Sequence, residues 1–391
     1  MVASAPLPRS RHGSISNAML RPSLLRPASL LLLVVTACGP SSVAQDAGAR
    51  DAAPSAPASD DAPARVVVPT DERTPLYEVV NVVDGDTVHV LRDGVREKLR
   101  LLSVDTEEKL SGNPNLSATK PETLFGQETT EWAQRFIPEH SSVDGRTMVS
   151  LRFPGGREAR DVYGRLLCHV VLADGTDFNV LLVRQGKSPY FNKYGNSTIC
   201  HEAFVAAQRA ARAEGLGVWD PATNTPDDPN APAAKRPYDR LLPWWDARAT
   251  AIDLARARHA RNPVLNVEAD RADDVQLAAW ASEGGATVEV FGAIDRIFVE
   301  DDGSRTLLMR TGDKARAVRA TIAAEHLARF DLADLARRAE AEFVQNYLVL
   351  RGTLAPNAER GGWILALTEP EQVRVGGPEP VLPAKGDGTR H

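Results

Sequence analysis

Aromatic side chains are missing from the first fifth of this 391-residue chain, and this limits where it can fold. The first aromatic residue is Tyr77. A segment poor in large apolar side chains buries too little surface to offset the conformational entropy lost on folding. Two later stretches, residues 221–237 and 376–391, are again rich in Pro, Gly, Asn or Asp. We therefore expect two folded regions, 75–220 and 238–375, joined by a linker and followed by a disordered tail.

The leader carries a targeting pattern. Two arginines precede a short apolar run, residues 29–35, which is too short to span a membrane but typical of a signal-peptide core. The run ends in Val35-Thr36-Ala37-Cys38, which resembles the lipobox of bacterial lipoproteins. That resemblance implies a signal peptide over residues 1–37, with Met19 as an alternative start, and lipidation of Cys38. An ordinary cleaved signal peptide is the competing interpretation.

The residues after Cys38 have the composition of a spacer. Between Pro40 and Ala64, 22 of 25 residues are Ala, Pro, Ser, Asp or Gly, which is typical of a solvated tether. We expect residues 38–74 to form a disordered tether. The protein would then be extracytoplasmic, attached to the membrane of the bacterial cell envelope by a lipid anchor.

Charge and cysteine content exclude several classes of protein. The formal net charge is −6, which argues against a polycationic nucleic-acid coat protein. Three cysteines are too few for a disulfide scaffold or a four-thiolate zinc site. Cys168 and Cys200 could pair in an oxidising compartment, and the sequence leaves that pairing open.

The first folded region begins with strands and is capped by helices. Asp84-Gly85-Asp86 separates two runs rich in β-branched residues and predicts a hairpin turn. A small β-barrel or α+β unit follows from this order of elements. The expected strands cover residues 77–83, 87–91, 97–104, 148–153 and 166–172, and the expected helices cover 121–136, 179–186 and 200–213.

Four separated motifs resemble the staphylococcal nuclease (thermonuclease) family over about residues 76–219. They are Val83-Asp84-Gly85-Asp86-Thr87-Val88, Arg100-Leu101-Leu102-Ser103-Val104-Asp105-Thr106-Glu107-Glu108, Asp161-Val162-Tyr163-Gly164-Arg165 and Leu182-Val183-Arg184-Gln185-Gly186. The resemblance implies a five-stranded OB-fold barrel with capping helices. It also implies a Ca²⁺-dependent nuclease that leaves 3′-phosphate ends on DNA or RNA.

The resemblance also assigns roles within the site. Asp86 and Asp105 would bind Ca²⁺, and hard carboxylate oxygens suit that ion. The carbonyl of Thr106 would complete the ligand set. Arg100 and Arg165 would contact the scissile phosphate, which a planar, permanently charged guanidinium can bind through two oxygens at once.

The general base is expected to be Glu108. The family usually has proline before this glutamate, whereas Glu107 precedes it here, so the assignment is open by one residue. Tyr163 is a candidate hydrogen-bond donor to a phosphate oxygen of the substrate. Tyr194 and Tyr190 are candidates for contact with a nucleotide, and Asn192 stands where the family has an aromatic residue.

Long-range attraction of DNA is expected to be weak, because residues 75–220 hold 17 Lys and Arg against 20 Asp and Glu. The rival hypothesis is a catalytically silent barrel that binds nucleic acid or protein. No obligate protein partner is inferred. The presence together of the acidic residues, the base and both arginines favours the enzyme.

The second folded region also predicts an OB-like β-barrel. After a helix over residues 238–260, we expect strands at 286–299, 305–310 and 315–320, a helix at 321–343, and strands at 347–354 and 363–367. Three strands, a helix and two strands is the OB-fold order. The similarity is topological only and does not fix a function.

Overall fold

The computed structural model describes residues 66–112, 119–225, 234–269, 287–311 and 317–384. The predicted signal peptide, the lipobox with Cys38 and most of the predicted tether lie outside the described residues. No helix among the described residues is both long and apolar enough to cross a membrane.

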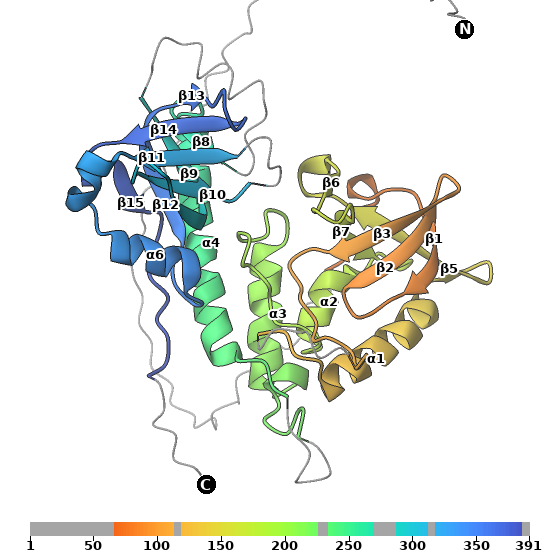
Figure 1. Ribbon diagram of the computed structural model, residues 1–391. Helices are drawn as coiled ribbons and strands as arrows, with labels where there is room; N and C mark the ends of the chain where they lie inside the picture. Colours follow the sequence, from red (N-terminus) through yellow and green to blue (C-terminus); the bar gives the residue numbers. More distant parts are fainter. Residues whose placement is uncertain (1–65, 113–118, 226–233, 270–286, 312–316, 385–391) are drawn as a thin grey trace, which may run out of the picture. The chain divides into compact units, whose positions relative to one another are not determined.

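The first region contains a closed five-stranded barrel of mixed strand direction (Figure 1). Strand β3 pairs in parallel with β7, and antiparallel pairing of β5 with both β1 and β7 closes the barrel. This confirms the predicted fold of the region. Its elements are β1 (Tyr77–Val82), β2 (Thr87–Arg92), β3 (Val95–Leu101), α1 (Leu124–His140), β4 (Ser142–Val143), β5 (Arg146–Arg152), β6 (Ala159–Arg160), β7 (Leu166–Val171), α2 (Phe178–Arg184) and α3 (His201–Ala213).

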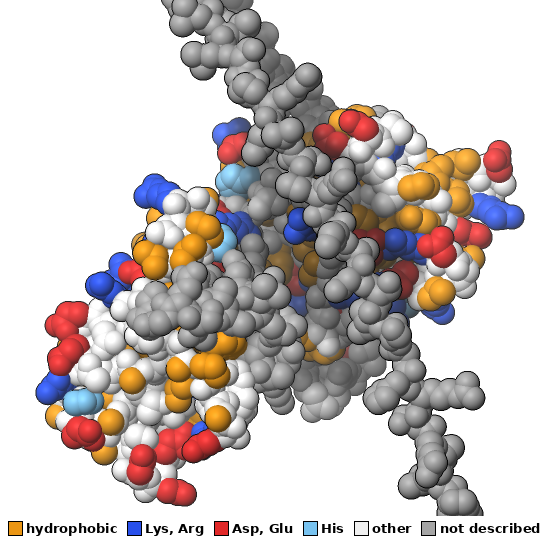
Figure 2. Space-filling model, turned by 90° about the horizontal axis from the view of Figure 1, so that it is seen from above, with side chains coloured by type: hydrophobic (Ala, Val, Ile, Leu, Met, Phe, Trp, Pro, Cys, Tyr) orange, Lys and Arg blue, Asp and Glu red, His pale blue; other side chains and the backbone are white. Residues whose placement is uncertain are grey.

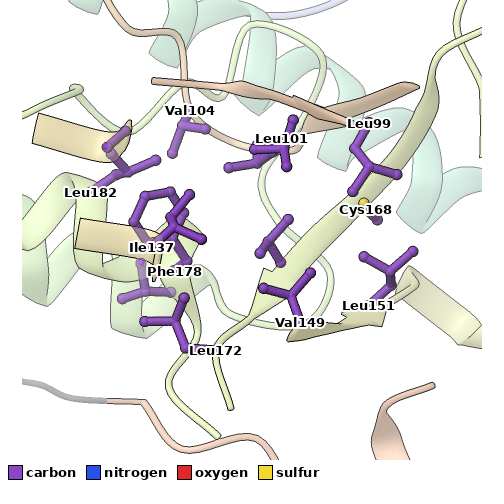
Figure 3. Close-up of a cluster of buried hydrophobic side chains, with 14 of the residues drawn as sticks. Leu99, Leu101, Val104, Ile137, Val149, Leu151, Cys168, Leu172, Phe178 and Leu182 are labelled. Atoms are coloured by element: carbon purple, nitrogen blue, oxygen red, sulfur yellow. The ribbon is translucent and has the colours of Figure 1, made fainter. Parts of the chain in front are cut away.

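Alternation along the strands fills the barrel with apolar side chains. Leu99 and Leu101 of β3 face the interior, whereas Arg100 between them faces outward and is only partly buried. Helices α1 and α2 cover the barrel with Ile137 and Phe178, as Figure 3 shows. The outward face of β3 is therefore where a charged group can be presented beside a rigid core.

The ends of the first region differ from the predicted boundaries. Residues 66–74, expected in the tether, pack on the barrel: Val68 is buried and Val67 forms a β-bridge with Thr176. Cys168 and Cys200 are both buried and free, so the structure contains no disulfide between them.

The second region begins with the long helix α4 and continues as an eight-stranded sheet. Its helices and strands are α4 (Tyr238–Arg261), β8 (Asn266–Glu268), β9 (Thr287–Val299), β10 (Arg305–Met309), β11 (Val318–Ile322), α6 (Leu332–Glu340), β12 (Tyr347–Thr353), β13 (Ala355–Pro356), β14 (Trp363–Leu367) and β15 (Val373–Val375). The helix predicted over 321–343 is shorter, because Asp331 caps α6 and a 3₁₀ helix, Ala324–Arg329, precedes it.

The expectation of a second closed barrel is wrong. The strand order is β13-β14-β11-β10-β9-β12-β15, with β8 beside β9. Closure would require β12 to pair with β14. One edge of β12 is held by β9, and β15 takes the other edge through Leu348, Val349 and Leu350. Since a strand has only two edges, the sheet stays open.

Candidate active site

The turn between β1 and β2 places the first acidic residue. The Asp86 amide donates to Asp84 Oδ1 at 3.0 Å, which fixes the turn. Gly85 is required there because a Cβ atom would lie 2.6 Å from the Thr106 side chain. The Thr106 amide in turn donates to Asp86 Oδ2 at 3.0 Å. The close approach at Gly85 thus joins two segments about 20 residues apart in the sequence.

Residues 105–108, named here the acid loop, follow the end of β3. Gly126 at the start of α1 lets this helix lie against the loop, because a Cβ atom would be only 2.1 Å from the Glu108 carbonyl oxygen. The Thr123 amide donates to that same oxygen at 3.0 Å. The backbone of the acid loop is therefore held between the barrel and helix α1.

Arg100 bridges the two predicted metal ligands. Its Nη1 pairs with Asp86 Oδ1, and its Nη2 lies 2.7 Å from Asp105 Oδ1. Asp86 and Asp105 are 6% and 1% exposed. The two carboxylates thus face a common point, with a positive charge between them.

Two further cations surround Asp105. Lys120 Nζ lies 2.9 Å from Oδ1, and Arg236 Nη2 lies 2.7 Å from Oδ2. Burial alone would raise the pKa of the Asp105 carboxyl, but Arg236, Lys120 and Arg100 together hold that pKa below its ordinary value. Asp105 is therefore a stable anion despite complete burial.

The two neighbouring glutamates have different environments. Glu107 is buried, and its carboxylate accepts hydrogen bonds from Thr123 Oγ1 at 2.6 Å, Asn224 Nδ2 at 2.7 Å and Tyr238 Oη at 3.1 Å. The Glu108 side chain is 38% exposed and faces Lys120 at 3.3 Å. Only Glu108 combines access to water with a place beside Asp105.

Arg165 lies at the start of β7, next to β3. Its Nε donates to Asp161 Oδ2 at 2.7 Å, and its guanidinium lies 5.6 Å from the centre of the Tyr163 ring. Because Leu166 pairs with Leu99, Arg165 and Arg100 come from adjacent strands. Within the described part of the chain, no hydrogen bond or ion pair joins Arg165 to Asp86, Asp105 or Glu108.

The three predicted nucleotide-contacting tyrosines differ in exposure. Tyr163 and Tyr194 are 80% and 60% exposed. Tyr190 belongs to the core, where it stacks on Phe204 with ring centres 4.8 Å apart. Its hydroxyl accepts from the Ser197 amide at 2.7 Å. Burial leaves no ring face of Tyr190 open to a base. Tyr163 and Tyr194 therefore remain as the candidates for contact with a nucleotide.

Comparison with known proteins matches the first region to a known family. The family model described as "Staphylococcal nuclease homologue" matches residues 98–221. The thermonuclease of Staphylococcus intermedius is 30% identical over 153 residues, which cover 39% of this chain and 80% of that protein. This chain belongs to the staphylococcal nuclease family.

Other relatives match the same part of the chain. The thermonuclease of Staphylococcus hyicus is 31% identical over 110 residues, which cover 28% of this chain and 56% of that protein. Endonuclease YhcR of Bacillus subtilis (strain 168) is 29% identical over 144 residues, 36% of this chain and 11% of that protein. This distant homology supports a nuclease-like function. The span matched by the family model contains Arg100, Asp105, Glu108 and Arg165 and ends before Arg236.

The donor set suits the divalent cation that staphylococcal nuclease membership implies. Asp86 and Asp105 offer only hard oxygens, which Ca²⁺ prefers. The Arg100 guanidinium already bridges them, so a cation between the two carboxylates fits the charges of the site. Asp86, Asp105 and the Thr106 carbonyl are the residues that would hold the ion.

Another group of potential metal ligands among the described residues has a structural explanation. His169, Asp177 and Cys200 lie together in the core. Asp177 Oδ1 caps helix α2, and its Oδ2 lies 2.8 Å from His169 Nδ1. Arg152 Nη1 donates to the Cys200 sulfur at 3.3 Å. The Arg152 guanidinium already faces the Cys200 sulfur, so we interpret His169, Asp177 and Cys200 as part of the packed core rather than as a metal site.

Sequence reasoning missed two cations of the site, Lys120 and Arg236. Lys120 stands in the polar loop before α1, and Arg236 stands in the segment predicted as a linker. Neither belongs to a motif of the staphylococcal nuclease resemblance. A single basic residue in a polar segment carries no sequence signal of burial, since Lys and Arg there are usually exposed.

Proposed function

We propose that this chain is a calcium-dependent nuclease that hydrolyses phosphodiester bonds in DNA or RNA. One observation carries the proposal: Arg100 bridges two buried carboxylates, Asp86 and Asp105, and the partly exposed Glu108 shares Lys120 with Asp105. This arrangement combines anion-binding cations, oxygen ligands and a base at one point on a rigid barrel. Phosphodiester hydrolysis needs these groups together.

Glu108 is the proposed general base. A solvent-accessible carboxylate that shares Lys120 with Asp105 can accept a proton from a water molecule, a role that generally contributes about 10²–10⁴-fold in rate. Lys120 Nζ lies 3.3 Å from Glu108 Oε1, so a cation stands beside the proposed base. Glu107 is excluded from the role by its three hydrogen bonds inside the protein.

Arg100 and Arg165 are the proposed phosphate-binding residues. Arg100 would exchange its carboxylate partners for oxygens of the scissile phosphate, and Arg165 would act from the neighbouring strand. Ca²⁺, when bound, would supply further positive charge where the transition state gathers negative charge. As in the resembled family, the product ends would be 3′-phosphates.

The exposed tyrosines would contact the substrate. Tyr163 beside Arg165 can donate to a phosphate oxygen, and Tyr194 can stack on a base. On the face shown in Figure 2, Lys and Arg side chains are interspersed with Asp and Glu. We therefore expect local phosphate contacts, rather than a broad basic surface, to hold DNA or RNA.

Location is a separate part of the proposal. The lipobox resemblance supports lipidation of Cys38 and an extracytoplasmic position on the cell envelope, with the membrane reached through the N-terminal anchor. Extracellular or envelope nucleic acid would then be the substrate.

The test is cleavage of single-stranded DNA and of RNA by the whole chain, with Ca²⁺ and with a chelator. We expect cleavage with Ca²⁺ and none with the chelator. Asp86→Asn should abolish activity, whereas Asp93→Asn, at an exposed left-handed turn position that Asn tolerates, should not. Cleavage that persists in chelator would contradict the proposed site. A folded chain that binds DNA without cleaving it would support the silent-barrel alternative.

A further inference from the structure

The active site receives a buried arginine from outside the span matched by the family model. Arg236 is 6% exposed and lies two residues before the start of helix α4. It lies 131 residues after Asp105, the residue that it contacts. The fold of the first region alone therefore does not complete the surroundings of Asp105.

Arg236 holds both the side chain and the backbone of Asp105. Its Nη2 donates to Asp105 Oδ2 at 2.7 Å, and its Nη1 donates to the Asp105 carbonyl oxygen at 3.1 Å. Its Nε donates to the Thr119 carbonyl oxygen at 3.1 Å. One planar guanidinium thus ties the acid loop to the polar segment before α1.

The segment that carries Arg236 is itself held in place. The guanidinium lies 5.4 Å from the ring centre of Tyr238 and 5.8 Å from that of Trp245. Tyr238 is partly buried, and its hydroxyl donates to Glu107 Oε1 at 3.1 Å. Trp245 packs edge-on against Phe191, with ring centres 4.7 Å apart. These contacts hold the segment that carries Arg236 in a fixed position.

The contacts of Asp105 are divided between its two oxygens. Oδ2 is bound by Arg236, whereas Oδ1 faces Arg100 and Lys120. We propose that Arg236 is a positioning residue, which fixes the rotamer of Asp105 so that Oδ1 alone is presented to a cation. This inference rests on the nuclease function proposed above and deepens it, because it makes the site depend on the segment after the nuclease region.

Arginine is suited to this role by its shape. A rigid fork can donate to a carboxylate and a carbonyl at once, which the single ammonium of lysine cannot do in the same fixed geometry. Residues that orient a metal ligand typically contribute about 10–100-fold to metal affinity or activity. Substitution of Arg236 by lysine, which keeps the charge but not the fork, can therefore separate the effect of positioning from the effect of charge.

The experiment compares Arg236→Met, Arg236→Lys and a matched control, Arg248→Met, all in the whole chain. Arg248, in helix α4, is also a buried arginine and is 2% exposed. It donates to the Lys193 carbonyl oxygen at 3.2 Å and to Tyr347 Oη at 3.2 Å. It does not contact the acid loop. The measurements are kcat and KM on a single-stranded DNA oligonucleotide, thermal unfolding, and Ca²⁺ titration by calorimetry without DNA.

We expect both Arg236 variants to lose about 10–100-fold in kcat, with KM changed less than about threefold, and to bind Ca²⁺ about tenfold more weakly. Arg248→Met should lower the unfolding temperature but keep kcat and Ca²⁺ affinity within about threefold of the wild type. If Arg236→Met fails to fold, Arg236→Lys, which keeps the charge, carries the comparison.

Three results would overturn the inference. Full activity of Arg236→Lys would show that charge, not orientation, matters. Equal loss of kcat in Arg248→Met would show a general loosening of the structure. Tighter Ca²⁺ binding and faster cleavage by Arg236→Met would make Arg236 a competitor of the metal. A wild-type chain without Ca²⁺-dependent cleavage would instead overturn the proposed function.

Discussion

Adjacent glutamates in the acid loop should respond in opposite ways to the same substitution. Glu107→Gln removes a buried charge that accepts three hydrogen bonds, from Thr123, Asn224 and Tyr238. Bonds to a charged acceptor contribute about 1.5–3 kcal/mol each and neutral ones about 1 kcal/mol. Glutamine keeps one carbonyl oxygen, so two bonds lose their charge assistance and the third loses its acceptor.

Relief from burying a charge offsets part of this loss. We expect the free energy of unfolding to fall by about 2 kcal/mol, or about 4–8 °C in unfolding temperature for a region of this size. The turnover of the molecules that remain folded should change little, because the Glu107 side chain faces inward.

Glu108→Gln should show the reverse pattern. Its carboxylate is 38% exposed and, among the residues that the structure describes, pairs only with Lys120 at 3.3 Å, so the stability cost should be at most about 1 kcal/mol. Loss of the general base should lower kcat about 10²–10⁴-fold. Urea denaturation and kcat at saturating DNA measure the two effects. A folded, inactive Glu107→Gln beside an active Glu108→Gln would show that the base is misassigned by one residue, and normal cleavage by both would refute the mechanism.

Three other predictions concern phosphate binding, location and pH. Arg165→Ala should lower kcat about 10²–10³-fold with little change in unfolding temperature, and normal turnover would remove Arg165 from the site. Cys38→Ser should move an epitope-tagged chain out of the membrane fraction, and a variant that stays there uncleaved would contradict the lipobox interpretation. Burial, with help from Arg248, lowers the pKa of Lys193 to about 8, whereas the unfolded value is about 10.4. Between these values the unfolded chain binds more protons, so stability should rise with pH. Lys193→Met should flatten this rise in urea titrations at pH 7.5 and 10, and an unchanged slope would refute the assignment.

Much of the first region could be predicted from the sequence because its signals are local. Alternation around Arg100 predicts a strand with one charged face, and Asp84-Gly85-Asp86 predicts the turn that presents Asp86. The four motifs, in their order along the chain, were sufficient to recognise the resemblance to the staphylococcal nuclease family. The sequence also located β9, β10, β11, β12 and β14 of the second region, but it did not predict β15, which pairs with one edge of β12.

The details of the site depend on packing that no local pattern reports. Tyr190 and Tyr194 are similar in sequence context, yet one is in the core and the other is exposed. Glu107 and Glu108 are adjacent, and only the positions of Asn224 and Tyr238 make the first a buried structural acid.

The sequence by itself determined the class of the first region through its order of strands and helices. The resemblance of its motifs to the staphylococcal nuclease family implied the five-stranded barrel, the acidic residues and the two arginines, because those motifs are local in the sequence. Only the tertiary structure decided which cations surround Asp105. Arg236 comes from a segment that looks like a linker, and its burial is stabilised by contacts with Tyr238, Trp245 and the Thr119 carbonyl oxygen. The physical reason is that a buried charge is tolerated only where its partners meet it in space, and the partners of Arg236 lie far away along the chain.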